Sequence, residues 1–150
     1  YRELPKQLTL VPLVVACIYS LFYGGWVLVG LTTGLIFISD LEPRARRLVF
    51  AAVASAFAAI FDPAILLQVA ALLAIWLLWE VGAMGGADAK LLMVITLVIQ
   101  QPMVFVFIAL AGGIQGGVAL LLRKKDIPYI VAIFAGSSLY ALNNLVLKIL

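Results

Sequence analysis

The chain has 150 residues, of which 66% are hydrophobic and 11% are charged, and its formal net charge is +3. Because soluble domains carry about a quarter charged residues, this composition indicates an integral membrane protein, and no nucleic-acid partner is expected. The sequence contains no His and a single Cys, Cys17, which excludes an intrachain disulfide, a Cys/His metal site and Ser-His or Cys-His catalysis. We therefore expect no metal and no cofactor, and any chemistry must come from carboxylates, Lys, Arg and neutral polar groups.

Long uncharged runs predict an all-α integral membrane protein built as a bundle of six to seven transmembrane helices. A helix crosses a bilayer with about 20 apolar residues, and the uncharged runs 7–39 and 91–122 are both much longer than that. Gly24-Gly25 divides the first run, and Gln100–Pro102 divides the second. The predicted spans are about 8–23, 26–39, 48–61, 64–79, 89–101, 103–122 and 129–147. The six-span alternative replaces the first two spans with one long helix kinked at Gly24-Gly25.

The basic residues indicate how these spans are oriented. With seven spans, nine of the ten Lys and Arg residues fall on one side of the membrane, and only Lys148 falls on the other. The positive-inside rule makes the basic side cytoplasmic, and the arginines of Arg44–Arg47 are interpreted as part of this topology signal. Asp40 and Asp88 then emerge on the same cytoplasmic face, and the six-span alternative also keeps them together. We expect a multi-pass protein of the cell membrane.

The segment Glu80–Leu92 is a glycine-rich hinge between two apolar runs, and after the boundary residue Glu80 it carries one acid, Asp88, and one base, Lys90. Gly85 and Gly86 allow another chain to approach the backbone closely. Asp88 follows them, at the point where the next helix is expected to begin. An ionisable residue beside a membrane is a candidate functional residue, but Asp88 could equally cap a helix that starts at Ala89. Both interpretations remain open from the residues alone.

Small residues recur at helical spacing in two of the predicted spans. The pairs are Gly30 with Gly34, Gly112 with Gly116, and Gly113 with Gly117. Such spacing lets helices pack closely in lipid, so it predicts contacts within the bundle and is weak evidence for a homo-oligomer.

Three short motifs follow one another along the chain and carry a family resemblance. They are Asp40-Leu-x-x-Arg44, Gly85-Gly-Ala-Asp-Ala-Lys90, and Ile127-Pro-Tyr129 with Gly136 behind it. Together they resemble the first aspartate box, the GxGD-x-K signature and the C-terminal Pro-aromatic segment of the type IV prepilin peptidases and archaeal preflagellin peptidases. The ordered set on one membrane face carries the resemblance, which covers about residues 26–147.

The chain departs from the family pattern at two places. Ala87 stands at the third position of the GxGD box, and Arg46-Arg47-Leu48 stands where the family commonly has Ile-Pro-Asn after the first box. The cysteine-rich cytoplasmic domain of the bifunctional bacterial members is absent, so the resemblance implies peptidase activity without methyl transfer. It also implies one transmembrane peptidase-like domain over residues 1–150, with a family-like core at about 26–147 and an extra span at about 8–23.

The resemblance implies a GxGD-type aspartyl endopeptidase, with Asp40 and Asp88 as its catalytic pair. Two close carboxyl groups share one proton, so one can activate water while the other polarises the scissile carbonyl. Gly85, Gly86 and Lys90 are the residues expected to support the site or bind substrate, although Lys90 could instead be an interface lysine that snorkels. The implied partners are the lipid bilayer and pilin-like or archaellin-like precursors, which would lose a basic leader at the cytoplasmic face.

Two alternatives come from other functional classes. One is a catalytically inactive membrane subunit in which Asp40 and Asp88 are helix caps at the interface. The other is a small transporter-like protein in which Asp88, Lys90 and Glu80 line a pathway. No charge lies near the centre of any predicted span, which argues against transport. We expect Glu80 to be a helix end that faces water.

Overall fold

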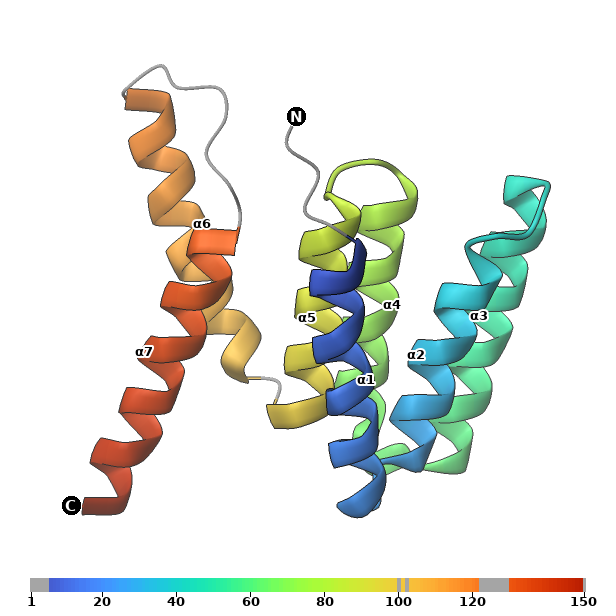
Figure 1. Ribbon diagram of the computed structural model, residues 1–150, viewed down its shortest axis with the longest axis horizontal. Helices are drawn as coiled ribbons and strands as arrows, with labels where there is room; N and C mark the ends of the chain where they lie inside the picture. Colours follow the sequence, from blue (N-terminus) through green and yellow to red (C-terminus); the bar gives the residue numbers. More distant parts are fainter. Residues whose placement is uncertain (1–5, 100, 102, 122–129, 150) are drawn as a thin grey trace. The chain divides into compact units, whose positions relative to one another are not determined.

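The computed structural model describes residues 6–99, 101, 103–121 and 130–149. These residues form seven α-helices and one short 3-10 helix, with no strand among them (Figure 1). The elements are α1 (Lys6–Phe22), α2 (Trp26–Ile38), α3 (Arg44–Phe61), η1 (Pro63–Ile65), α4 (Leu66–Glu80), α5 (Gly86–Ile99), α6 (Met103–Leu121) and α7 (Ile130–Ile149). The all-α prediction is confirmed, and every predicted span corresponds to a helix whose ends differ by at most four residues.

The turn between α1 and α2 excludes the alternative of one long kinked helix. Gly24 has a φ of +81°, a conformation that side chains disfavour, and the backbone N–H of Gly25 bonds to the carbonyl of Ser20 at 2.8 Å. The chain therefore reverses direction here, as glycine permits. That all seven helices cross a bilayer stays a prediction.

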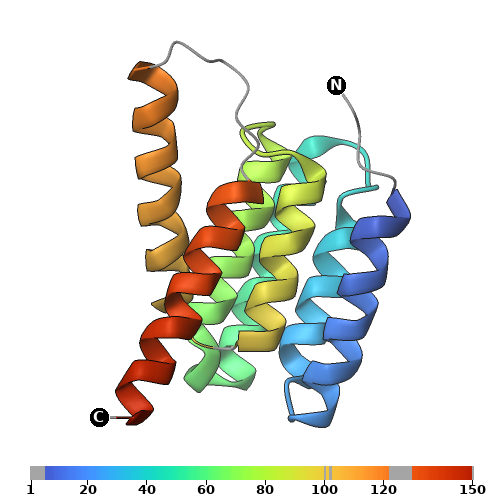
Figure 2. The same cartoon turned by 60° about the vertical axis from the view of Figure 1, so that its left-hand side comes forward.

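The chain divides into two compact units, residues 1–100 and residues 101–150. The prediction of one domain over residues 1–150 is not tested by this division. In the first unit, α1 packs on α5, α2 on α3, and α4 on both α3 and α5. Successive helices run in opposite directions, which Figures 1 and 2 both show. The alternation brings the start of α3 and the start of α5 to the same end of the unit.

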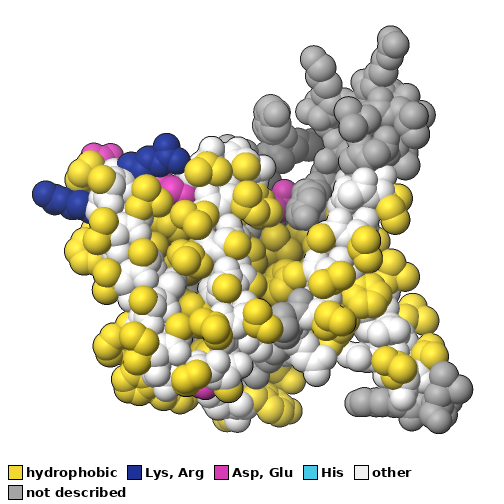
Figure 3. All heavy atoms as spheres, turned by 180° about the vertical axis from the view of Figure 1, so that it is seen from behind, with side chains coloured by type: hydrophobic (Ala, Val, Ile, Leu, Met, Phe, Trp, Pro, Cys, Tyr) yellow, Lys and Arg dark blue, Asp and Glu magenta, His cyan; other side chains and the backbone are white. Residues whose placement is uncertain are grey.

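The core of the first unit lies where α2, α4 and α5 meet. Its fully buried large side chains are Leu28 and Leu35 of α2, Leu72 and Trp76 of α4, and Met93 and Leu97 of α5. The outer faces of helices in this unit are also apolar: Ile60 of α3 is 78% exposed and Phe37 of α2 74% exposed. Figure 3 shows hydrophobic side chains along the flanks, whereas most charged side chains of this unit gather at one end. A soluble protein rarely exposes so much contiguous apolar surface.

Within the described residues, one helical stretch is long and apolar enough to cross a membrane. It is Pro63–Glu80, with 18 residues and a mean hydropathy of 1.8, and 28% of it is buried in the structure. Four further apolar helical stretches are shorter, at 10–17 residues.

The second unit is the helical pair α6 and α7. The two helices approach closely at Gly136, because a Cβ there would lie 2.6 Å from the backbone nitrogen of Ile108. Tyr140 donates a hydrogen bond to the side-chain oxygen of Gln101, and its ring meets Phe107 edge-on at 5.8 Å between centroids. At Gly113 nothing lies within 4 Å of a Cβ, so this glycine makes no close contact within the α6–α7 pair, and the packing role expected of it stays a prediction. The Ile127–Tyr129 motif and the Arg123–Lys125 loop lie outside the described residues.

Candidate functional site

Asp40 lies on an exposed turn at the charged end of the first unit. It follows α2, whose last turn is extended by bonds from the Asp40 N–H to Phe37 O (3.2 Å) and from the Leu41 N–H to Ile38 O (3.0 Å). The side chain is exposed. The loop between α4 and α5 lies at the same end of the unit, whereas Asp62, after α3, lies at the other (Figure 1). The order of the helices therefore places the segments that carry Asp40 and Asp88 at the same end of the unit.

Asp88 lies in the first turn of α5, which begins three residues earlier than expected. The backbone N–H of Ala89 bonds to Gly85 O at 3.0 Å, so Gly85 is the cap position and Asp88 is the third residue of the helix. The interpretation of Asp88 as the cap of a helix starting at Ala89 is therefore wrong. A carboxylate in the first turn is favoured by the positive end of the helix dipole. Desolvation acts in the opposite direction: partial burial raises the pKa of the Asp88 carboxyl, which precedes the uncharged segment 91–99.

The glycines of the hinge lie against polar and aromatic side chains. A Cβ at Gly86 would be 3.2 Å from the indole Nε1 of Trp79, and one at Gly85 would be 3.6 Å from Asp88 Oδ2. Gly86 thus lets the Trp79 ring lie close to the start of α5. The ring fills the space beside Gly86 that we expected to be open for a substrate backbone. Lys90 is half-buried, one residue beyond Ala89 on α5.

Glu80 is the centre of an ion-pair network that the sequence did not predict. Its carboxylate accepts from Arg47 at 2.7 Å between Oε1 and Nη2, and Arg44 Nε lies 3.6 Å from the same oxygen. The Glu80 side chain is only 9% exposed. The expectation that Glu80 faces water is therefore wrong. Glu80 can be enclosed here because the two arginines replace the water that a carboxylate loses at the edge of an apolar bundle.

The same network anchors the turn that carries Asp40. Arg47 Nη1 donates to Ser39 O at 3.2 Å, one residue before Asp40. The buried indole N–H of Trp76 lies 2.9 Å from Ser39 Oγ and 3.0 Å from Leu35 O, so it bonds to the last turn of α2. A continuous set of polar contacts therefore runs from the end of α4, through α3, to the end of α2.

The two aspartates are at one end of the unit but do not touch. Within the described residues, no hydrogen bond joins the carboxyls of Asp40 and Asp88, and burial alone accounts for the raised pKa of Asp88. No group of three or more His, Cys, Asp or Glu residues in the described part of the chain could hold a metal ion. The arrangement provides one exposed carboxylate, one partly desolvated carboxyl that holds its proton to higher pH, and a neighbouring cation network.

Sequence reasoning found the two aspartates and the glycines but missed Arg47, Glu80, Ser39, Trp76 and Trp79 as a connected set. One signal was available for Glu80 and Arg47, because acids and arginines beside apolar helices usually pair. The partners are more than thirty residues apart, so no periodicity links them.

Comparison with protein-family models, with curated proteins and with solved structures finds no match.

Proposed function

We propose that this chain is a membrane-embedded aspartyl endopeptidase that removes the basic leader from pilin-like or archaellin-like precursors at the cytoplasmic face. The observation that carries the proposal is the position of Asp40 and Asp88 at the same end of one helical unit. The Glu80–Arg47–Ser39 contacts hold the Asp40 turn to the end of α4, the helix that precedes the Asp88 segment. The largely apolar flanks of the unit support a location in the bilayer.

In this proposal Asp88 supplies the proton and Asp40 the base. Partial burial raises the pKa of Asp88, so its protonated form persists to higher pH and can donate a hydrogen bond to the scissile carbonyl. Ionised Asp40 takes a proton from water, and the resulting hydroxide attacks the carbonyl carbon. The C–N bond then breaks, and the leaving amine takes a proton from the acid pair. Neither a metal nor a covalent intermediate takes part.

Catalysis requires the two carboxyls to come closer than they are here. Catalytic hydrogen bonds are often long or absent without substrate and form in the complex. The Asp40 side chain is exposed, so it can change position without breaking a contact of its own. The backbone of its turn stays in place during that movement, because Arg47 bonds to the carbonyl of the neighbouring Ser39. Lys90 adds positive potential near Asp88, and Gly85 leaves the backbone beside Asp88 Oδ2 open. The exposed acids Asp40 and Glu42 suit a basic leader.

The alternative of a catalytically inactive membrane subunit is favoured by one observation, the absence of any bond between the two carboxyls in the described structure. Activity decides between the two. Asp40→Asn and Asp88→Asn should each lower cleavage of a prepilin-like precursor by about 10²–10⁴-fold, the contribution of general acid–base catalysis. The measurement is turnover by purified protein in detergent, at matched amounts of folded enzyme.

Asp62→Asn is the matched control, because Asp62 lies at the opposite end of the unit. Its Oδ1 accepts a hydrogen bond from the Ala64 N–H at 3.1 Å, which the amide oxygen of Asn can also accept. Cleavage by this control should equal that of the wild type and should survive a strong chelator. Robust cleavage by the Asp88→Asn protein would remove the aspartyl peptidase assignment, whereas a wild-type protein that does not cleave the precursor would favour the inactive subunit.

A further inference from the structure

The last two turns of α4 contact both of the segments that carry the candidate acids. Trp76 donates a hydrogen bond to the end of α2, which Asp40 follows, and Trp79 lies against Gly86, two residues before Asp88. Helix α4 packs on both α2 and α5, and Figure 1 shows its end at the same end of the unit as the end of α2 and the start of α5. One helix therefore contacts both acid-bearing segments.

Trp76 fixes the end of α2 from the inside of the unit. Its side chain is fully buried, and its indole N–H lies 3.0 Å from Leu35 O and 2.9 Å from Ser39 Oγ. The Ser39 hydroxyl in turn donates to Leu35 O at 2.9 Å. If the turn after α2 moved away from α4, a buried N–H donor would lose its partners, which is unfavourable. The backbone just before Asp40 is therefore held in place relative to α4.

Trp79 fixes the start of α5 through the outer edge of its indole ring. A Cβ at Gly86 would lie 3.2 Å from Nε1, 3.6 Å from Cε2 and 3.8 Å from Cζ2, so the edge that contains the nitrogen faces this glycine. Gly86 is the first residue of α5 and Asp88 the third, so both belong to the same helical turn. A shift of that turn against the ring therefore moves Asp88 with it.

We propose that Trp76 and Trp79 are positioning residues that together set the separation between the Asp40 and Asp88 segments. Neither indole is a reacting group, because Trp76 acts through Ser39 and Trp79 acts through the first turn of α5. The inference rests on the proposed function, since the spacing of two carboxyls has a chemical consequence only when both act on one peptide bond. A misplacement of about 1 Å can lower a rate about 10²-fold, so catalysis depends on where these two backbones are held.

Removing the Trp76 hydrogen bonds should slow cleavage without weakening substrate binding. Trp76→Phe should lower kcat for a prepilin-like precursor by about 10²-fold and leave KM unchanged, at matched amounts of folded enzyme. Ser39→Ala is the milder variant, because it removes one acceptor of the indole N–H and keeps Leu35 O. It should lower kcat less, and Ser39→Thr, which retains a hydroxyl, should restore the wild-type rate. Trp76→Phe shrinks a buried side chain, so the two Ser39 variants carry the test where that protein does not fold.

The contact between Trp79 and Gly86 allows an exchange of size between the two positions. Gly86→Ala places a methyl group where the indole edge lies, and Trp79→Phe removes that edge. Each should lower kcat by about tenfold, because each shifts the turn that carries Asp88. Independent losses would multiply to about 10²-fold in the double variant. If the two positions act through their contact, the double variant should be faster than that product, since the smaller ring leaves room for the methyl group.

A distance measurement tests the spacing without any substrate. Single cysteines at Leu41 and Lys90, in a protein with Cys17→Ser, carry spin labels, and pulsed electron paramagnetic resonance measures the distance between them in detergent. Leu41 is exposed on the turn after α2, and Lys90 lies on α5 beyond Asp88. We expect one narrow distance distribution in the labelled protein with both tryptophans, and a shifted or broader distribution when either one is replaced by Phe.

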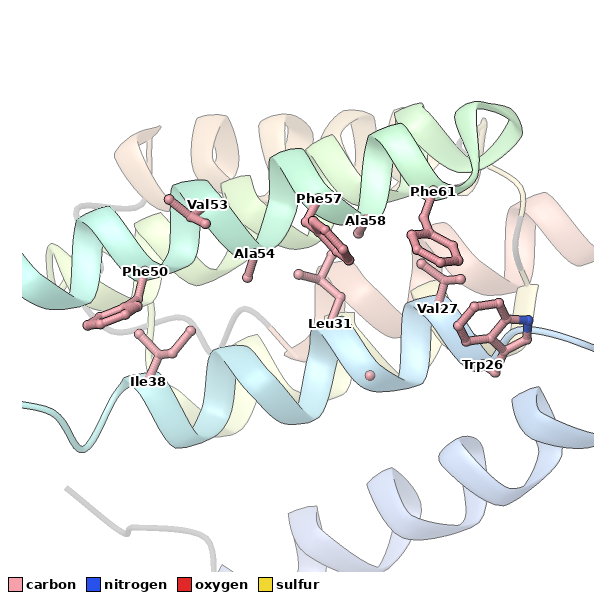
Figure 4. Close-up of a pocket in the computed structure, with 11 residues that line it drawn as sticks. Trp26, Val27, Leu31, Ile38, Phe50, Val53, Ala54, Phe57, Ala58 and Phe61 are labelled. Atoms are coloured by element: carbon pink, nitrogen blue, oxygen red, sulfur yellow. The ribbon is translucent and has the colours of Figure 1, made fainter.

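Trp26 provides the matched control, because it is the third tryptophan of the chain and lies at the far end of α2. Its ring lies edge-on to Phe61 (Figure 4), with 5.7 Å between the ring centroids. This contact joins α2 to α3 at the end of the unit away from both acids. Trp26→Phe should therefore leave kcat, KM and the labelled distance unchanged.

Unchanged distance distributions in both the Trp76→Phe and Trp79→Phe proteins would overturn the inference. So would a loss of kcat of the same size after Trp26→Phe, or a rise in KM alone, which would make the tryptophans part of the substrate site. A wild-type protein that does not cleave the precursor would refute the proposed function, whereas distances that depend on the two tryptophans would still support the spacing that they set.

Discussion

Replacing Glu80 by Gln should destabilise the fold substantially, although the substitution preserves size. The Glu80 carboxylate is 9% exposed and lies 2.7 Å from Arg47 Nη2, and the Arg47 side chain is itself only 23% exposed. Removing one partner of a fully buried ion pair costs about 3–5 kcal/mol, and an exposed pair contributes about 0–1 kcal/mol. Because Arg47 retains some contact with solvent, and its Nε already lacks a hydrogen-bond partner, we expect a loss of about 2 kcal/mol.

That loss corresponds to a fall in Tm of about 4–8 °C for a chain of this length. The measurement is heat-induced loss of helical circular dichroism in detergent. Arg47→Gln should give a similar fall in Tm, because the buried Glu80 carboxylate then keeps only Arg44, whose Nε lies 3.6 Å away. Arg44→Gln should cost about 0.5 kcal/mol or less, since Arg44 is 56% exposed and lies 3.6 Å from the carboxylate.

The double substitution of Glu80 and Arg47 by Gln separates pairing from other causes. If the two charges are coupled, the double variant should lose clearly less stability than the two single losses added together. Asp62→Asn serves as the control for removal of a carboxylate elsewhere in the unit, with its cap to Ala64 retained. A Tm for Glu80→Gln equal to that of Asp62→Asn would refute the reasoning, as would strict additivity of the Glu80 and Arg47 substitutions.

Three further predictions concern pH, packing and topology. Because burial raises the pKa of Asp88, the folded protein holds this proton more tightly than the unfolded chain, so wild-type stability should fall as pH rises from about 3.9 through the raised value. Asp88→Asn should remove that slope and match or exceed wild-type stability at neutral pH; a variant with the wild-type slope would contradict the assignment. Gly136→Ala should destabilise the α6–α7 pair by about 1–3 kcal/mol through overpacking, while Gly113→Ala on α6, with open space around it, should be neutral or stabilising in thermal melts. Single cysteines at Glu42 and Asp62, in a protein without its native Cys, should label from opposite sides of the membrane, and labelling from one side would reject the topology.

Local sequence signals were sufficient to predict the helices and most of their ends. The turn signals Asp62-Pro63 and Gly24-Gly25 act on neighbouring backbone, so their effect is visible without knowing the fold. Gly82 is a further example, with a φ of +75° immediately after α4, where its N–H bonds to Trp79 O at 3.0 Å.

The start of α5 was misjudged because a tertiary contact outweighs local preference there. Glycine disfavours a helix interior, so Gly85 and Gly86 were interpreted as hinge and the helix was expected to begin at Ala89. In the structure Gly86 is already helical, and Trp79, seven residues earlier, lies against it. Because Gly86 has no Cβ, the indole ring of Trp79 can lie close to the helix backbone. The same lack of a side chain lowers the local helix propensity, which is why the sequence favoured a later start.

The spacing of small residues likewise could not say which glycine meets a neighbouring helix. Gly30, Gly34 and Gly113 have nothing within 4 Å of a Cβ, while Gly136, which has no paired glycine four residues away, lies against the backbone of α6. Periodicity reports that a small residue is available on a face, but the partner that fills the space comes from another part of the chain.

The sequence by itself determined the all-α class, the order and approximate ends of the helices, and the two acids at the ends of apolar segments. These depend on hydrophobic runs and on residues that bias their own backbone. Only the tertiary structure decided that Glu80 is enclosed by two arginines and that Ser39 and Trp76 hold the Asp40 turn. Those contacts join residues 8–37 positions apart on different helices, and their energies depend on burial and on distances of about 3–3.6 Å, which arise only when α2, α3 and α4 pack together.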